Sequence, residues 1–365
     1  MAIQLRCTNR CNNAPNAVLL ATMLLMSVAS MRARAQSWDL GALRGLAGLT
    51  ADQWKAVNRG EAQARVLDTK GKHEVAVVGV TRLRATTACF VTRFQDIENF
   101  KKSSSVLRIG KFAKPVTLQD LERFRLEFRD IAALRNCRVG SCDVKLSAGV
   151  IERLGRDVDW SAPDHVPKAQ TVLREEFLSY IETYLSDGNA SLIEYRDKNK
   201  PVLLADEFQA LLNARPGLAG FVPEFREYLA QYPNKPLPGV DEFLYWSTES
   251  FGLKPVTSIT HVAIYHEQGQ AVIASKQVYG SHYFEGSLGL TVALDDIAEQ
   301  SKPGMYLLYL NRSRIDLLSG FFGGLRRAFL RGRLRDGIKK NLVEVARKLE
   351  SSCAQYPLAA PTSVL

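Results

Sequence analysis

The chain has 365 residues, of which 46% are hydrophobic and 24% are charged. This composition excludes a disordered chain, and the length suits one large domain or two ordinary ones. The formal net charge is +10. Four of the arginines lie in the first 35 residues, so the rest of the chain carries +6, which is modest for its length and does not require a nucleic-acid partner.

The first 35 residues have the pattern of a secretory signal. They contain no acidic residue, and the apolar run "AVLLATMLLMSVAS" extends from Ala17 to Ser30. This run is shorter than the roughly 20 residues that cross a bilayer. The sequence "ARA" at 33–35 then predicts cleavage before Gln36. We expect export to a periplasmic or extracellular location. The alternative is an N-terminal anchor that is not cleaved.

Four cysteines remain after residue 35, and an even number in an exported protein favours disulfides. Cys137 and Cys142 lie in "CRVGSC", which can close a small loop. A metal site would need two further ligands nearby, and only Asp143 is available. We therefore expect a Cys137–Cys142 disulfide and no metal. Cys89 and Cys353 either pair with each other or stay as buried thiols.

The segment 50–145 begins with a short helix capped by Thr50 and ended by Gly60. A β-hairpin follows around a turn at 69–72, and its second strand is apolar on both faces, which indicates that both are covered. Phe90, Phe94 and Phe100 recur at helical spacing. "VLRIGKF" is a short strand. The stretch "TLQDLERFRLEFRDIAAL" mixes helix and strand signals, so its structure stays open.

Residues from about 150 to 240 are helical and polar in pattern, with amphipathic helices at 167–185, 206–212 and 224–232. After Pro238 the chain changes to strand-like runs, with breaks at 267–269, 285–286 and 301–304. Breaks this close together predict an antiparallel meander. The aromatic stretch "DEFLYWSTESFGLKP" just before it is either a packing cluster or the mouth of a pocket for an apolar ligand.

The stretch "GFFGGLRRAFLRGRLRDGIKKNLVEVARKLE" (320–350) is basic and carries one apolar stripe at helical spacing. Three interpretations compete: a nucleic-acid helix, a helix on a membrane surface, and a core helix that lies across the meander. Export disfavours the first, and a peripheral membrane contact stays open. We favour the third, because most amphipathic stripes pack on a core.

The order of these elements resembles the helix-grip fold of the START-like lipid-transfer superfamily. The likeness covers about 60–145 and 255–350, and it includes the strand "YLLYLNRSR" followed by the glycine-containing loop and the long helix. It implies an α+β fold in which a curved antiparallel β-sheet grips a long C-terminal α-helix. A single domain at 36–365 would then carry a helical insertion at about 150–240.

The resemblance also implies a cavity between sheet and C-terminal helix that holds a lipid or another hydrophobic small molecule. The residues expected to contact this ligand are His261, Tyr279, His282, Tyr283, Phe322 and Phe329. We expect no cofactor and no nucleic-acid partner.

Catalysis has weaker support in the sequence, which lacks the common hydrolase, metalloprotease and nucleotide-binding motifs. The acidic pairs Glu175–Glu176 and Asp295–Asp296 are adjacent, so we expect each pair to splay apart and face solvent. Two alternatives to a binding protein are an enzyme on the same scaffold, cyclase- or hydrolase-like and using His261 or His282, and an envelope interaction protein with no ligand.

Overall fold

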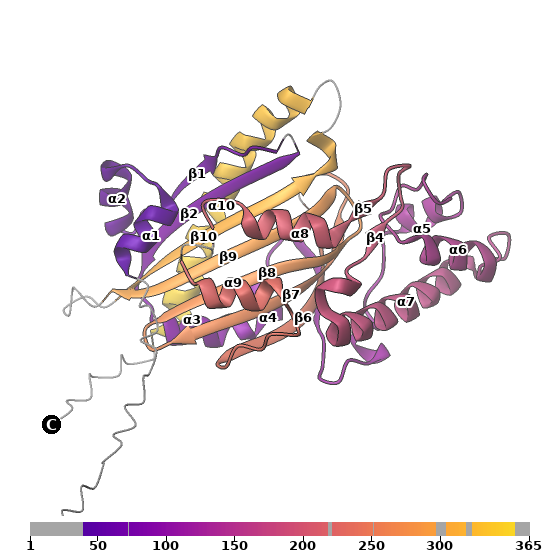
Figure 1. The fold of residues 1–365 in the computed structure, drawn as a ribbon, viewed down its shortest axis with the longest axis horizontal. Coiled ribbons are helices and arrows are strands. Elements are labelled where there is room, and N and C mark those ends of the chain that lie inside the picture. The colour runs from indigo at the N-terminus through magenta and orange to yellow at the C-terminus, as the bar shows by residue number, and fades with distance from the viewer. Residues whose placement is uncertain are drawn as a thin grey trace, which may run out of the picture. The chain divides into compact units, whose positions relative to one another are not determined.

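The computed structural model describes residues 39–71, 73–217, 221–250, 252–296, 304–318 and 323–354, and of residues 323–330 the backbone alone. All of them belong to one unit, Trp38–Leu365. The fold is α+β (Figure 1). Its strands are β1 (Gln63–Leu67), β2 (Glu74–Leu83), β3 (Val106–Lys111), β4 (Glu194–Tyr195), β5 (Val202–Leu203), β6 (Val240–Glu249), β7 (Val256–Glu267), β8 (Gln270–Gly280), β9 (Phe284–Asp296) and β10 (Gly304–Ile315).

The helices flank these strands in sequence and in space. They are α1 (Leu40–Ala47), α2 (Ala51–Asn58), α3 (Thr87–Gln95), α4 (Ile97–Lys101), α5 (Phe128–Leu134), α6 (Ala148–Asp157), α7 (His165–Asp187), α8 (Leu204–Asn213), α9 (Pro223–Ala230) and α10 (Gly323–Cys353), with short 3-10 turns η1 (Leu118–Leu121), η2 (Gly188–Ser191) and η4 (Asp316–Leu318). The predicted start of α2 is confirmed, because Thr50 and Gln53 form a reciprocal capping box.

Eight strands form one antiparallel sheet in the order β1-β2-β10-β9-β8-β7-β6-β3. The predicted hairpin is β1–β2, and β2 is buried along almost its whole length, as its apolar sequence indicated. The long strands from β6 to β10 follow one another as an antiparallel meander. Because adjacent strands in this meander are joined by short connections, the sheet places residues near in sequence side by side.

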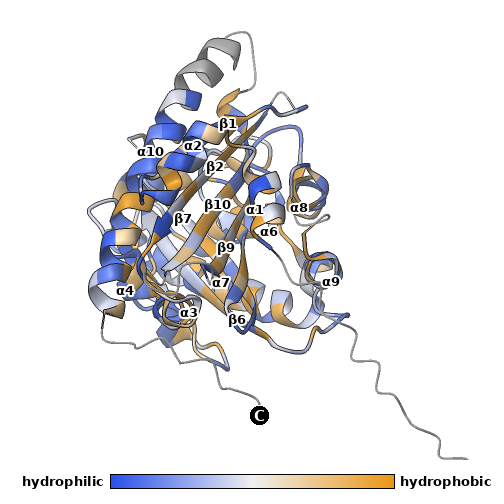
Figure 2. Cartoon of the chain, turned by 90° about the vertical axis from the view of Figure 1, so that its left-hand side faces the viewer, coloured by the Kyte–Doolittle hydropathy of each residue, from blue (hydrophilic) through white to orange (hydrophobic). Residues whose placement is uncertain are grey.

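Successive residues of each strand point to opposite sides of the sheet, which therefore has two distinct faces. We call the side that includes Ala263, Val272 and Leu308 the α7 face, because these residues share a hydrophobic core with α7. We call the side that includes Val262, Ile273 and Leu307 the α10 face, because these residues share a core with α3 and α10. Figure 2 shows α3, α4 and α10 on one side of the strands and α8 and α9 on the other.

Helix α10 lies directly on the sheet at Gly79 of β2. A Cβ atom at Gly79 would meet Ile338 Cγ2 and Leu342 Cδ1 at 2.6 Å each, so only glycine permits this approach. At its C-terminal end the helix is tied down by the Cys89–Cys353 disulfide and by Lys348, whose Nζ donates to the carbonyl of Lys102 at 2.6 Å. The C-terminal half of α10 is therefore fixed to α3 and to the loop after α4.

The structure corrects two details of the sequence analysis. The break expected at 285–286 lies inside β9, because the chain turns earlier, at 281–283. The aromatic stretch before the meander is a strand, β6, whose pattern of alternating large residues places Trp246 on the α7 face and Tyr245 on the α10 face. Within the described ranges, no helix combines the length and the hydrophobicity needed to cross a bilayer.

Candidate functional site

The α10 face is divided into two halves of different character. Towards α3 it is apolar and buried, with residues such as Val262, Ile273 and Ala293 in one hydrophobic core. Towards the other ends of the same strands it becomes polar and mostly uncharged. This second half, which we call the polar floor, consists of Ser258, Thr260, Ser275, Gln277, Ser287, Thr291, Tyr309, Asn311 and Ser313.

The polar floor lies on central strands of the sheet, yet most of it is only half-buried. Ser275 and Gln277 are half-buried, whereas their neighbours Ala274 and Lys276, which point to the α7 face, are 1% and 2% exposed. The difference shows that the α10 face is less completely covered than the α7 face at the same strand positions. The floor is nevertheless sheltered, because Thr260 and Thr291 are each 8% exposed.

Several hydroxyl groups of the polar floor have no hydrogen-bond partner. Ser287, Asn311 and Ser313 bond to one another, with Ser287 Oγ and Ser313 Oγ 2.9 Å apart. In contrast, the hydroxyls of four other floor residues meet no partner among the residues that the structure describes: Ser258, Thr260, Ser275 and Thr291. Sheltered hydroxyl groups without a protein partner can donate and accept hydrogen bonds with a bound molecule.

One ion pair borders the polar floor. Lys101 Nζ, at the end of α4, lies 2.9 Å from Glu249 Oε1 on β6. Burial acts to lower the pKa of Lys101, but the charge of Glu249 outweighs burial and raises it. Ser247 donates a second hydrogen bond to Glu249 at 2.7 Å. The pair is thus mutually neutralised, and it leaves no free charge at this edge of the floor.

The α7 face holds a cluster of buried ionisable residues. His261 on β7 lies opposite Lys276 on β8, and His261 Nδ1 is 2.7 Å from the Tyr184 hydroxyl of α7. On its other side, His261 Nε2 is 3.4 Å from Glu242 Oε2, which also accepts a hydrogen bond from the Tyr228 hydroxyl. Glu242 is 30% exposed, so a chain of polar groups leads from the surface inward to Tyr184.

Burial sets the protonation of this cluster. Burial lowers the pKa of His261 and lowers that of Lys276 well below its ordinary value, so both favour the neutral state. Burial alone would raise the pKa of Glu242, but hydrogen bonds from His261 and Tyr228 bring it down to about 2. Lys276 Nζ donates to Asn189 Oδ1 at 2.6 Å and lies 4.6 Å from the ring centre of Tyr184. Such a cluster could relay a proton, but its inner members are almost fully enclosed.

A second buried cluster surrounds the turn between β8 and β9. His282 Nε2 lies 3.0 Å from Asp130 Oδ2, and both side chains are 4% exposed. Beside them Lys145 Nζ lies 3.5 Å from Asp197 and 3.2 Å from Asp316. This network joins the turn to α5, to the segments that carry Lys145 and Asp197, and to η4, so it fixes the end of the sheet.

The predicted ligand contacts do not all meet in one place. His261 and Tyr279 point to the α7 face, where the Tyr279 ring packs at a tilt against Phe177 of α7, with ring centres 4.4 Å apart. They are therefore separated by the sheet from α10. His282 and Tyr283 lie in the β8–β9 turn. Phe322 lies outside the described residues, and so does the side chain of Phe329.

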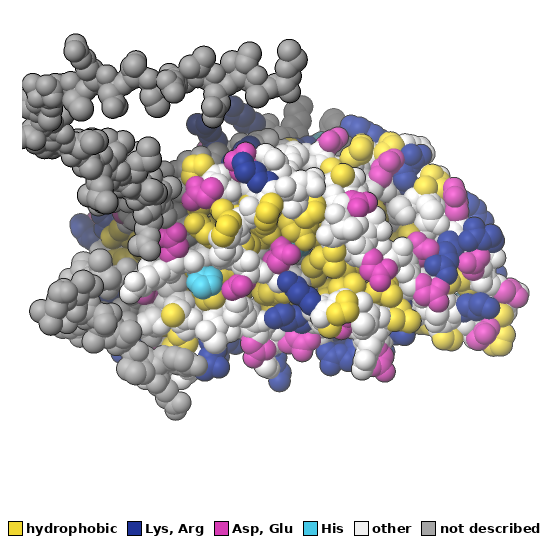
Figure 3. Space-filling model, turned by 60° about the horizontal axis from the view of Figure 1, so that its bottom comes forward, with side chains coloured by type: hydrophobic (Ala, Val, Ile, Leu, Met, Phe, Trp, Pro, Cys, Tyr) yellow, Lys and Arg dark blue, Asp and Glu magenta, His cyan; other side chains and the backbone are white. Residues whose placement is uncertain are grey.

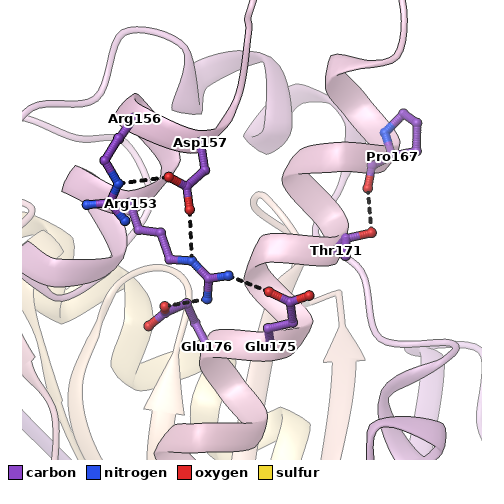
Figure 4. Close-up of polar contacts among 7 residues, drawn as sticks. All are labelled: Arg153, Arg156, Asp157, Pro167, Thr171, Glu175 and Glu176. Atoms are coloured by element: carbon purple, nitrogen blue, oxygen red, sulfur yellow. Dashed lines mark hydrogen bonds and ion pairs between the residues drawn. The ribbon is translucent and has the colours of Figure 1, made fainter.

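The expected solvent exposure is confirmed for Glu175, whose side chain is 43% exposed, but it is wrong for Glu176, Asp295 and Asp296, which are partly buried. Arg153 of α6 reaches across to α7, where its guanidinium contacts Glu176 at 2.7 Å and also binds Glu175 (Figure 4). Asp295 accepts a hydrogen bond from the backbone of Thr87 at 2.7 Å, and Asp296 pairs with a largely covered arginine, Arg82, whose side chain is 12% exposed. These carboxylates join helices to the sheet or to one another, which adjacency in sequence does not reveal.

Both cysteine pairs are close enough for disulfides. The Sγ atoms are 2.03 Å apart in Cys137–Cys142, in agreement with the expectation, and 1.96 Å apart in Cys89–Cys353, which decides between the two alternatives for that pair. Among the described residues, no group of three or more His, Cys, Asp and Glu side chains is arranged to hold a metal ion.

The surface in Figure 3 shows acidic and basic side chains intermixed around a central band of hydrophobic ones. This face of the molecule therefore presents no extended area of a single charge.

Known proteins give no further guidance, because no protein-family model and no curated protein matches the sequence. The polar floor was missed by the sequence analysis. Its signal is a run of small polar residues at every second position, as in Ser258–Thr260 and Ser275–Gln277, but alternation alone does not tell whether the polar side is a sheltered site or an outer surface.

Proposed function

We propose that this chain is an exported protein of the START-like, helix-grip type that binds or transfers a lipid or similar small molecule on the α10 face. The order of elements supports the resemblance: N-terminal strands, the helices α3 and α4, the meander, and then one long helix that packs on the sheet. The helical insertion, expected at about 150–240, would then occupy the chain between β3 and β6 and cover the α7 face.

The observation that carries the proposal is the incomplete filling of the α10 face. An antiparallel sheet can leave one face wholly to solvent, but this face is partly closed by the protein and partly left accessible. Here the apolar half is closed by α3 and α10, while the polar floor beside it remains accessible. A molecule with an apolar part next to a polar part would fit this division.

The two disulfides are consistent with export, since such bonds persist in oxidising compartments. We rank an enzyme below a binding protein, because the two histidines that such an enzyme would use, His261 and His282, are 2% and 4% exposed. Neither is placed where a substrate could reach it without rearrangement of the fold.

Native mass spectrometry of the full chain purified from the envelope fraction tests the proposal. We expect a bound molecule that organic extraction releases. The variant Ser275→Phe fills the polar floor and should purify without that molecule, whereas Ser179→Phe, on the exposed surface of α7, should retain it. A chain that carries no extractable molecule and takes up none from mixed lipid vesicles would instead support an interaction protein without a ligand.

A further inference from the structure

We infer that the ligand of the α10 face carries a neutral, hydroxyl-rich head group that lies on the polar floor. This inference rests on the proposed function and names the class of molecule that such a site would take. It follows from three properties of the floor: its unpartnered hydroxyls, its lack of net charge, and its position beside an apolar surface.

The unpartnered hydroxyls form an array rather than isolated groups. Thr260 of β7 is paired across the strands with Gln277 of β8, and Thr291 of β9 with Tyr309 of β10. The four hydroxyls lie on β7, β8 and β9, and neighbouring strands are about 4.8 Å apart, so the array extends over roughly 10 Å across three strands. A partner that satisfies it must offer several hydrogen-bonding groups spread over that distance. A fatty acid or a simple hydrocarbon has too few.

The charge of the floor excludes an anionic head group as the best fit. Two charged strand residues face this half among those described: Glu249, which Lys101 already neutralises, and Lys111 of β3, whose Nζ donates to the backbone carbonyl of Gln95. An anion placed beside the Lys101–Glu249 pair would lie near the Glu249 carboxylate, whose partner charge is already taken up by Lys101. The groups that remain are hydroxyls and the carboxamides of Gln277 and Asn311, which both donate and accept and therefore match the hydroxyls of a neutral polyol or sugar.

The floor lies on central strands of the sheet, and its residues are small, uncharged and partly sheltered. The ring of Tyr309 adds a half-buried apolar surface with a polar end, on which the C–H face of a sugar ring can pack. Beyond the floor, Ile273 and Ala293 continue the same face as an apolar surface that suits an alkyl chain.

The experiment compares three probes below their micelle-forming concentrations, measured by calorimetry on the full chain. They are dodecyl maltoside, dodecanoate and dodecylphosphocholine. We expect dodecyl maltoside to bind roughly tenfold or more tightly than the other two, since several additional hydrogen bonds of about 1 kcal/mol each form with it alone. Maltose, which lacks the dodecyl chain, distinguishes the source of the head group. If maltose binds measurably, the natural ligand is a free saccharide; if it does not bind, the ligand is a glycolipid.

The variant that tests the site removes three hydroxyls and keeps the shape: Thr260→Val, Ser275→Ala and Thr291→Val together. It should weaken dodecyl maltoside binding roughly tenfold or more and leave dodecanoate binding within about twofold. Because these hydroxyls bond to none of the residues that the structure describes, the melting temperature should stay within about 2 °C. Thr171→Val is the matched control: its hydroxyl bonds to the carbonyl of Pro167 on the far surface of α7, and both affinities should stay unchanged (Figure 4).

Two outcomes distinguish the inference about the head group from the proposed lipid-binding function on which it rests. If dodecanoate binds as tightly as dodecyl maltoside, or if the triple variant binds dodecyl maltoside normally, the hydroxyl-rich head group is wrong while a lipid-binding protein remains. If none of the three probes binds the wild-type chain, both the inference and the proposed function are wrong.

Discussion

The two faces of the central sheet are formed by the same strands, but they differ in how completely their side chains are covered. On the α7 face, large side chains such as Trp246 and Tyr279 are 1% and 0% exposed, and even ionisable groups are enclosed. On the α10 face, the same strands carry small hydroxyl residues that stay partly accessible. Since strand residues alternate between the faces, one sequence can supply a closed core on one side and a candidate binding surface on the other.

The two faces differ in burial because different segments of the chain cover them. The α7 face is covered by helices from the N-terminal part and the middle of the chain: α1, α2, α7, α8 and α9 all contribute buried residues to its core. The described part of the α10 face has α3, α4 and α10 for cover. The comparison teaches that the long segment between β3 and β6 helps to close one face, whereas the polar floor on the other face stays partly accessible.

The largest effect on stability should come from removing a buried aromatic ring from the α7 face. Phe177 of α7 is 3% exposed and packs against Phe124 and Tyr279, with ring centres 5.0 and 4.4 Å away. Phe177→Ala should lower the free energy of unfolding by about 3–5 kcal/mol in chemical denaturation. Phe128, which is 73% exposed, offers the same substitution without burial, and Phe128→Ala should change stability by less than about 0.5 kcal/mol. Equal effects would mean that the α7 face is not the main core.

The next effect depends on pH and concerns the edge of the His261 cluster. The folded-state pKa of Glu242, about 2, lies below its ordinary value of 4.5, so the folded state binds fewer protons than the unfolded one. Its contribution to stability is thus present above pH 4.5 and is lost as the pH falls towards 2. With allowance for its partial exposure, we expect a contribution of about 2–3 kcal/mol at neutral pH.

Acid titration of stability checks this expectation. Glu242→Gln should be less stable than the wild type at pH 7, and the gap should close as the pH approaches 2. Glu182→Gln, which changes an exposed carboxylate on α7, should follow the wild type throughout. A gap for Glu242→Gln that stays constant with pH would show that its hydrogen bonds do not depend on its charge.

The smallest effect should come from the contact between α10 and the sheet. Gly79→Ala places a methyl group against Ile338 and Leu342 and should cost about 1–3 kcal/mol by overpacking. Adding Leu342→Ala makes room, so the double variant should lose less stability than the two single variants together. Gly155→Ala inside α6 meets nothing within 4 Å and should instead stabilise by about 0.5–1 kcal/mol. If the stability changes of Gly79→Ala and Leu342→Ala simply add, α10 does not contact the sheet at Gly79.

The sequence by itself determined the local elements of this protein. Capping at Thr50, the period of Phe90 and Phe94, and the apolar runs after Pro238 each report the conformation of a few neighbouring residues, and the helices and strands follow them. β6 was missed because its large aromatic residues occupy both faces of the strand, so the usual alternation of apolar and polar residues is absent.

Only the tertiary structure decided what these elements do together. Cys89 and Cys353 are 264 residues apart, and their pairing depends on α10 lying against α3. His261 and Ser258 lie on one strand three residues apart, yet the sheet sends one to the closed face and the other to the polar floor. Which face is covered depends on where distant helices pack, and that packing is set by the sum of many weak contacts between segments far apart in the chain, which no local pattern records.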